Sequence, residues 1–181
     1  MKLKKQLPKA GVLWLTGLSG SGKTTITKIL YNHLRKKYNK IKLLDGDVLR
    51  SREKIYHSKN SFTKSNRIKI GKLYSRICKK FVNKGYFVII AVMALYKEVH
   101  GYNRKTIKNY IEIFLDVPIK ELIKRDPKNI YKKFFQKKIS NVTGLDLKYD
   151  KPKKSNITIK WKNNVLKENI VKKILIYLMR E

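Results

Sequence analysis

The feature that most constrains this chain is the glycine-rich segment GLSGSGKT at residues 17–24. It fits the pattern G-x-x-x-x-G-K-[S/T], follows the apolar run GVLWLT, and opens a stretch with helical periodicity. In such a loop the backbone N–H groups point at phosphate oxygens, and the helix N-terminus adds partial positive charge. A glycine-rich turn without a ligand is the alternative, but the strand–loop–helix context disfavours it. The residues that we expect to bind ATP here are Gly17, Leu18, Ser19, Gly20, Ser21, Gly22, Lys23, Thr24 and Thr25.

Apolar runs of strand length alternate with helical patterns along the chain. This alternation predicts right-handed βαβ units, and hence a mostly parallel sheet with helices on both faces. We therefore expect an α/β fold of the P-loop NTPase type, a three-layer sandwich with a mobile lid, as one kinase domain over residues 1–181. Strands are expected at 11–16, 41–45, 86–93, 110–116 and 156–160, and helices at 23–37, 63–84, 118–125, 127–137 and along the apolar stripe from Leu166 to Leu178.

A second polar cluster, DGDVLR, follows the second expected strand. Its carboxylates, Asp45 and Asp47, suit Mg²⁺ binding and activation of an acceptor hydroxyl, while Arg50 would bind an anionic acceptor through two hydrogen bonds. Asp-Gly is also a common turn, so the neighbouring phosphate loop is what favours a functional role. We expect Lys23 to reach the β- and γ-phosphates and to be catalytic with Asp47, and Thr24 and Asp47 to bind Mg²⁺.

The segment RDPKNIY at residues 125–131 joins two expected helices. Small P-loop kinases close a lid with arginines and lysines over the phosphates, which excludes water as a competing acceptor. Arg125 is therefore expected to contact the nucleotide, the alternative being a solvated run of charges. We expect lid segments at about residues 50–66 and 125–150.

The composition is strongly basic, with 45 Lys and Arg residues, 12 Asp and Glu residues, and a net charge of +33. Nucleic-acid binding is one interpretation. The lysines are nevertheless spread along the whole chain, which is also rich in Ile, Asn and Tyr, the residues that A+T-rich genes encode. Compositional drift accounts better for this pattern, so we do not expect nucleic acid as a partner, although a cationic surface still attracts nucleotides.

Other features of the sequence limit the cellular location of the protein and the metal or disulfide chemistry that it can carry. No apolar run approaches the roughly 20 residues that a membrane span needs, so no membrane association is expected. Cys78 is the single cysteine, which rules out a disulfide framework and favours a cytoplasmic protein. His33, His57 and His100 show no metal-binding spacing, and we expect structural or surface roles for them.

The motifs together resemble one family. LWLTGLSGSGKTTI, LLDGDVLR, SFTKSNR, FVNKGYFVII, RDPKNIYKK and VTGLDLKYDKP occur in the order and spacing of adenylylsulfate kinases, over roughly residues 11–160. The resemblance implies phosphoryl transfer from ATP to the ribose 3′-hydroxyl of adenylyl sulfate, which gives PAPS, by a homodimer. It implies that Asp47 orients or deprotonates that hydroxyl. The substrate-binding residues that it implies are Asp45, Asp47, Arg50, Phe62, Arg67, Met93, Ala94, Lys128, Val142 and Thr143.

The sequence departs from the family pattern among the residues that are expected to bind the acceptor. Ala94 replaces a serine that can be phosphorylated, and Val142 replaces a phenylalanine expected to stack on adenine, at a cost of about 1–3 kcal/mol. These changes resemble a divergent branch from surface-polysaccharide gene clusters, which includes cytidine diphosphoramidate kinase. A smaller pyrimidine would fit beside Val142, so a cytidine nucleotide is an acceptor as well supported as adenylyl sulfate.

Three other functions remain open at this point. A nucleic-acid-handling P-loop protein, such as a polynucleotide kinase, fits the charge. A nucleotide-binding module without catalysis is disfavoured by the intact Lys23, Thr24 and Asp47. A small-metabolite kinase of the gluconate or shikimate type would not explain the series of motifs from DGDVLR to VTGLD.

Overall fold

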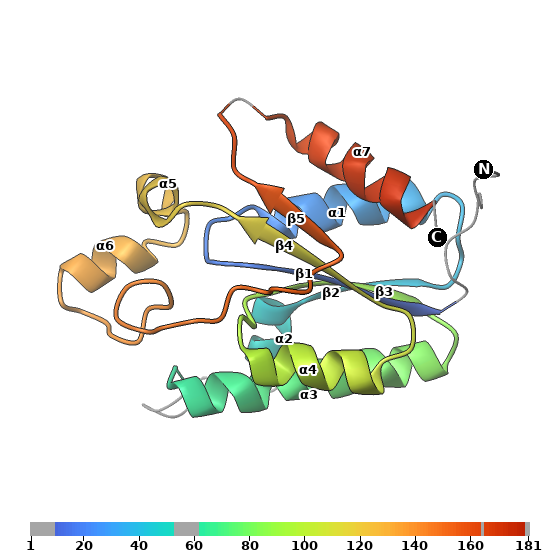
Figure 1. The fold of residues 1–181 in the computed structure, drawn as a ribbon, viewed down its shortest axis with the longest axis horizontal. Helices are drawn as coiled ribbons and strands as arrows, with labels where there is room; N and C mark the ends of the chain where they lie inside the picture. Colours follow the sequence, from blue (N-terminus) through green and yellow to red (C-terminus); the bar gives the residue numbers. More distant parts are fainter. Residues whose placement is uncertain (1–9, 53–61, 164, 180–181) are drawn as a thin grey trace.

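The computed structural model describes residues 10–52, 62–163 and 165–179. A parallel five-stranded sheet is flanked by helices, which confirms the predicted fold class (Figure 1). The elements in chain order are β1 (Gly11–Gly17), α1 (Lys23–Leu34), β2 (Ile41–Asp45), α2 (Gly46–Arg52), α3 (Lys64–Asn83), β3 (Phe87–Val92), α4 (Lys97–Thr106), β4 (Tyr110–Asp116), α5 (Ile119–Arg125), α6 (Ile130–Phe135), β5 (Ile157–Lys160) and α7 (Lys167–Leu178).

The strands are ordered β2-β3-β1-β4-β5, so that β1 lies in the middle of the sheet. Every residue of β1 and of β3 is buried, which is why these segments read as continuous apolar runs rather than as alternating ones. All pairings between neighbouring strands are parallel. The carboxyl ends of the strands therefore meet at one edge, where ligands bind in sheets of this kind.

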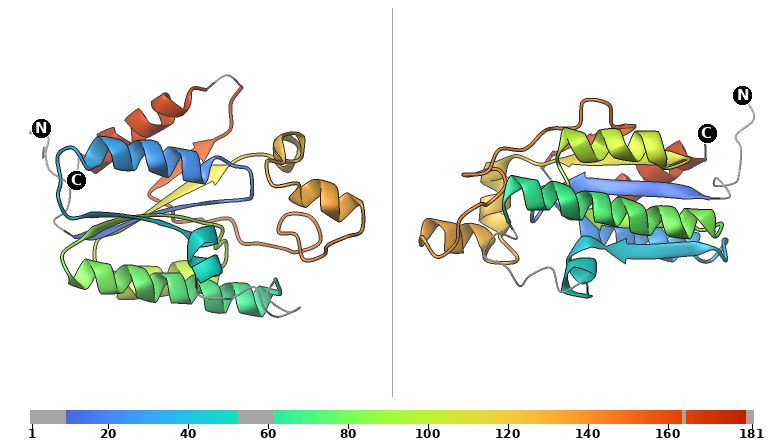
Figure 2. Two further views of the ribbon diagram at one scale, coloured as in Figure 1. Left: turned by 180° about the vertical axis from the view of Figure 1, so that it is seen from behind. Right: turned by 90° about the horizontal axis from the view of Figure 1, so that it is seen from below.

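Helices cover both faces of the sheet, as the views from the front, from behind and from below show (Figures 1 and 2). α1 and α7 pack on one face, and α7 buries Val171, Ile174 and Leu178 against it, as its apolar stripe predicted. α3 and α4 pack on the other face. A third apolar cluster, which includes Leu122 and Tyr131, lies under α5 and α6 beside the carboxyl edge.

The structure contains two helices that the periodicity did not predict. α4 buries Val99, His100 and Asn103, so two of its three buried side chains are polar and no apolar stripe appears in the sequence. α2 has only seven residues, too few for a periodic pattern. The predicted helix over 127–137 is shorter in the structure, because Asn129 adopts a positive φ of 53° and α6 begins only after it.

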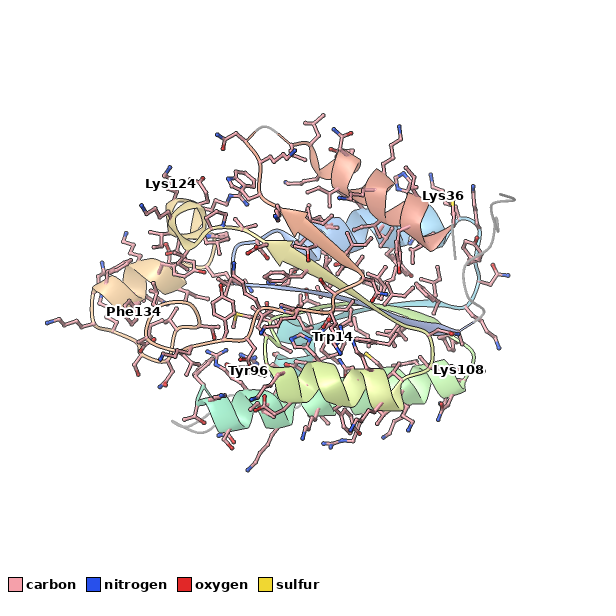
Figure 3. The ribbon with its side chains drawn as sticks, viewed as in Figure 1. Trp14, Lys36, Tyr96, Lys108, Lys124 and Phe134 are labelled. Atoms are coloured by element: carbon pink, nitrogen blue, oxygen red, sulfur yellow. The ribbon has the colours of Figure 1, made fainter. Side chains whose placement is uncertain are left out.

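Several other expectations concern the body of the protein. Cys78 is a free, buried thiol whose pKa is raised by burial. Among the described residues, no helix has both the length and the apolar character that a membrane crossing requires. Part of the expected lid at 50–66, namely residues 53–61, lies outside the described residues. The exposed lysines occur at both ends of the molecule, with Lys124 at one end and Lys36 and Lys108 at the other (Figure 3).

Candidate active site

A cavity of about 1140 Å³ opens along the carboxyl ends of the strands. All the site residues predicted from the sequence line it except Gly17, Leu18 and Ala94. Ala94 is instead buried in the cluster between the sheet and the layer of α3 and α4. The Leu18 side chain is buried in the cluster under α5 and α6. Most of the residues that the motifs single out therefore surround a single cavity.

The phosphate loop has the backbone shape that its glycines predict. Gly20 and Gly22 have φ angles of 77° and 93°, a region that other residues rarely adopt, and Gly22 directly precedes α1. Gly17 is needed for another reason, because a Cβ there would lie 2.8 Å from the Ser21 hydroxyl oxygen. The loop consequently turns back on itself at the N-terminus of α1, where backbone N–H groups are free to bind anions.

Lys23 points into this loop. Its Nζ donates hydrogen bonds to the carbonyl oxygens of Gly17 at 2.9 Å and Leu18 at 2.7 Å. Burial lowers the pKa of the Lys23 ammonium to about 8, an effect that the nearby Asp47 and Asp45 carboxylates only partly offset. The Lys23 ammonium supplies a large part of the positive charge that the loop offers to phosphate. This group therefore loses its proton just above neutral pH.

This shifted pKa predicts a pH dependence of nucleotide binding. Because phosphates favour the charged ammonium, the affinity for ATP should be nearly constant below about pH 7 and should fall by up to about tenfold between pH 7 and 9. Isothermal titration with Mg²⁺ and a non-hydrolysable ATP analogue from pH 6.5 to 9.5 measures it. The Lys23→Met variant, which binds more weakly, should show a flat profile, and an equal inflection in both proteins would contradict the assignment.

Asp45 connects the phosphate loop to the segment after β2. Its Oδ2 accepts a hydrogen bond from the Thr24 hydroxyl at 2.8 Å, and its Oδ1 accepts one from the backbone N–H of Asp47 at 2.9 Å. Both carboxylate oxygens of Asp45 therefore hold the phosphate loop and the DGDVLR segment beside each other. The sequence predicted that the motifs would be adjacent, but not that Asp45 would bridge them.

The oxygens of this cluster fit a magnesium ion shared with ATP. Mg²⁺ takes one or two carboxylates together with phosphate oxygens and waters, rather than a cage made only by protein. The Thr24 hydroxyl and the Asp45 and Asp47 carboxylates supply such ligands beside the loop. In the described part of the chain, no group of three or more His, Cys, Asp or Glu side chains forms a metal site by itself.

Asp47 lies at the first turn of α2 and faces Lys128 of the loop between α5 and α6, with which it forms an ion pair. Burial raises the pKa of the Asp47 carboxyl, but Lys128, assisted by Arg50 and Lys23, lowers it more, so that the pKa lies below the ordinary value. The carboxylate is therefore ionised at neutral pH. It can accept a hydrogen bond from a hydroxyl placed beside the phosphate loop.

Next to Asp47, an aromatic ring and two guanidinium groups form one wall of the cavity. The Arg50 and Arg67 guanidinium carbons lie 5.8 Å and 5.4 Å from the centroid of the Phe62 ring. Arg67 is 6% exposed, and it donates to the carbonyl oxygens of Phe62 and Asn141, each at 2.8 Å. The remaining guanidinium nitrogen of Arg67, Nη1, is buried and has no hydrogen-bond partner among the described residues. Arg67 also lines the cavity. This wall can stack on a base and bind an anion.

The segment RDPKNIY combines two roles that the sequence could not separate. Asp126 accepts hydrogen bonds from the backbone N–H groups of Ile130 and Lys132, each at 2.8 Å, and so begins α6. Arg125 and Lys128 line the cavity. Within this charged run, Asp126 is therefore structural, whereas Arg125 and Lys128 face the cavity.

Two aromatic residues of the site were missed by sequence reasoning. The Tyr131 hydroxyl donates to the Ser19 carbonyl oxygen at 3.1 Å, which fastens α6 to the phosphate loop. Trp161, after β5, lines the cavity beneath Arg125. No motif marks Trp161, and the segment RDPKNIY does not reveal that its Tyr131 contacts the phosphate loop, because both residues act through contacts distant in the sequence.

The geometry agrees with comparisons to known proteins. A family model described as adenylylsulphate kinase matches residues 9–160. The cytidine diphosphoramidate kinase of Campylobacter jejuni is 39% identical over 163 residues, which are 90% of this chain and 91% of that protein. The adenylyl-sulfate kinase of Clostridium acetobutylicum is 37% identical over 178 residues, 98% of this chain and 86% of that protein.

A solved structure shows the same arrangement of elements. The APS kinase CysC of Mycobacterium tuberculosis, in complex with AMPPNP and APS, matches with a TM-score of 0.84 and 26% identity, over 94% of this chain and 98% of that one. The family model covers most of the sequence, and both relatives align over more than four fifths of their length. The chain therefore belongs to the adenylylsulphate kinase family of ATP-dependent phosphotransferases.

Proposed function

We propose that this protein transfers the γ-phosphoryl group of ATP to the ribose 3′-hydroxyl of a nucleotide whose 5′-phosphate carries a second group. The observation that supports this most is the position of Asp47. Its carboxylate is close enough to the Lys23 ammonium of the phosphate loop and to Arg50 for both to lower its pKa, and Arg50 lies against Phe62 in the wall that also contains Arg67. A sugar hydroxyl bound at Asp47 would have its base and its 5′-substituent on that wall.

The proposed reaction is a direct displacement. The 3′-oxygen forms a bond to the γ-phosphorus, the bond from that phosphorus to the β,γ-bridging oxygen breaks, and ADP leaves. Lys23 binds the phosphate oxygens that become more negative, and Asp47 orients the hydroxyl and accepts its proton as the new bond forms. Mg²⁺, held by Thr24 and the neighbouring carboxylates, would neutralise charge on the β- and γ-phosphates.

The ion pair between Asp47 and Lys128 does not obstruct this step. Both side chains are half exposed, and exposed pairs contribute only about 0–1 kcal/mol. An acceptor hydroxyl can therefore replace Lys128 on the carboxylate at little cost. The lysine can then turn towards the phosphates, which is the role expected of a lid residue.

Two acceptors satisfy this description, adenylyl sulfate and cytidine diphosphoramidate. Val142 lines the cavity and offers no aromatic face opposite Phe62. A purine has the larger stacking surface, so the absence of a second ring costs a purine more than a pyrimidine. This favours the cytidine nucleotide, in agreement with the similarity to the Campylobacter jejuni enzyme.

The test is phosphorylation of each acceptor by ATP labelled at the γ-phosphate, followed by ³¹P NMR to locate the new phosphate. We expect label on the ribose 3′-oxygen, with a higher kcat/KM for the cytidine nucleotide. Failure of both acceptors would contradict the proposal. A salt-dependent affinity for a random oligonucleotide that survives the Lys23→Ala substitution would instead favour a nucleic-acid-handling protein.

A further inference from the structure

After α6, the chain forms a tight loop at residues 141–147 before it returns to the sheet (Figure 1). The loop begins at Asn141, which has a positive φ of 61°, a conformation that is uncommon outside glycine. It bends again at Gly144, whose φ is 94°. A backbone held in sparsely populated conformations persists only where its surroundings fix it, so this loop needs contacts that hold its shape.

The Asp146 carboxylate supplies such contacts. Its Oδ2 accepts a hydrogen bond from the backbone N–H of Asn141 at 2.7 Å, and its Oδ1 accepts one from the backbone N–H of Val142 at 2.6 Å. Hydrogen bonds from N–H groups to a carboxylate are charge-assisted and about twice as strong as those between neutral groups. Both oxygens of this exposed side chain therefore hold the loop closed on itself.

The same loop supports the wall that contains Arg67. The Asn141 carbonyl oxygen accepts a hydrogen bond from Arg67 Nη2 at 2.8 Å, and Arg67 Nε donates to the Phe62 carbonyl oxygen at 2.8 Å. A guanidinium group is planar and rigid, so fixing Nε and Nη2 also fixes the direction of Nη1. This Nη1 is the nitrogen that is buried without a partner among the described residues. Its direction depends on where the loop places one carbonyl oxygen.

We propose that Asp146 is a positioning residue for the acceptor: it holds the loop, and the loop aims Arg67 at the anionic 5′-group. Asp146 is not among the residues that line the cavity, so it would act without touching the substrate. Its role rests on the proposed function for the identity of the acceptor. The phosphate loop is held by other contacts, from Asp45 and Tyr131, so ATP binding should not depend on Asp146.

The kinetic test compares the two substrates in wild type, Asp146→Asn and Asp146→Ala. Asparagine keeps one oxygen that can accept a backbone N–H, whereas alanine keeps none. We expect Asp146→Ala to raise the acceptor KM by about tenfold, with kcat and the ATP KM within about threefold, because a loss of positioning on the bound anion is a loss of binding. Asp146→Asn should raise the acceptor KM by less. Equal effects on ATP and acceptor, or an unchanged acceptor KM, would overturn the proposal.

A matched control is Asp150→Asn, which removes a carboxylate from the same segment but outside the loop. The Asp150 Oδ2 accepts a hydrogen bond from the backbone N–H of Lys97 at 3.0 Å, and the asparagine oxygen can still accept it. The acceptor KM of this variant should stay within about twofold of wild type. A rise equal to that of Asp146→Ala would show that the loss of charge, and not the loop, is responsible.

A second measurement needs no acceptor and so separates the role of Asp146 from the proposed reaction. Hydrogen exchange followed by mass spectrometry reports the N–H groups of residues 141 and 142. Phenylglyoxal, which modifies accessible arginines, reports the Arg67 guanidinium through peptide mapping. We expect Asp146→Ala to speed both by about tenfold and Asp150→Asn to change neither. Unchanged rates in Asp146→Ala would overturn the proposal even if wild type phosphorylates its acceptor. Faster rates in a protein whose wild type phosphorylates neither acceptor would support the hold on Arg67 and contradict the proposed function alone.

Discussion

Replacing Asp47 with asparagine should lower kcat by about 10²- to 10⁴-fold, because the amide cannot accept the proton of the acceptor hydroxyl. The carboxylate is ionised and lies beside Lys23 in the cavity, so it is the group best placed for this role. The KM for ATP should stay within about threefold, since the loop that binds the phosphates is unchanged. Steady-state rates with each acceptor and with saturating ATP measure the effect.

The control for this variant is its stability. Asp47 is half exposed and its ion pair with Lys128 is a surface contact, so the loss of charge should cost at most about 1 kcal/mol of unfolding free energy. A loss of activity with unchanged thermal unfolding and unchanged ATP affinity would support a catalytic role. A kcat within threefold of wild type would show that Asp47 does not act on the hydroxyl.

The largest expected effect on stability lies away from the cavity, at Glu112 in β4. This carboxylate is fully buried; it accepts a hydrogen bond from the His100 ring and forms an ion pair with Arg104, both on α4. The Tyr110 hydroxyl also donates to it, at 3.1 Å. Replacing Glu112 with glutamine would leave the Arg104 charge without its partner, and breaking a buried pair costs about 3–5 kcal/mol. We expect the thermal unfolding midpoint to fall by roughly 10 °C or more.

A matched control is Glu121→Gln on α5, which breaks the i,i+3 pair with the exposed Lys124 and should cost less than about 1 kcal/mol.

Glu112 also predicts a pH dependence of stability. Burial raises the pKa of Glu112, but His100 and Arg104 lower it more, so that it lies below 4.5. Its contribution to stability is therefore complete above pH 4.5 and is lost as the pH falls further. Chemical unfolding at pH 7 and pH 4 measures both effects, and a Glu112→Gln protein as stable as wild type would contradict them.

Much of the fold was predictable because its signals are local. The strands that are buried on both faces read as apolar runs, and the phosphate loop and α7 carry patterns of a few neighbouring residues. α4 was not predictable in this way, since it packs through His100 and Asn103. The partner of His100 is Glu112, which lies on a strand that otherwise reads as apolar. A contact between a helix and a strand leaves no periodic signal in the sequence.

The candidate site, like the fold, combines residues that local motifs reveal with contacts that only the folded chain creates. The residues of the phosphate loop, Asp47 and Arg67 stand in recognisable motifs, and the cavity brings them together. The bridge from Asp45 to Thr24 and the contact of Tyr131 with the loop depend on how distant segments meet. Such contacts cannot be inferred from the spacing of residues along the chain. The role of each side chain in binding or catalysis remains a prediction that the proposed experiments test.

The most direct test of the central claim is a crystal structure with a non-hydrolysable ATP analogue, Mg²⁺ and the preferred acceptor. We predict that the triphosphate binds in the loop of residues 17–24 and that an Asp47 oxygen lies about 2.6–3.2 Å from the acceptor 3′-oxygen. The account would be contradicted by a structure in which Asp47 stays paired with Lys128 and the 3′-hydroxyl lies elsewhere.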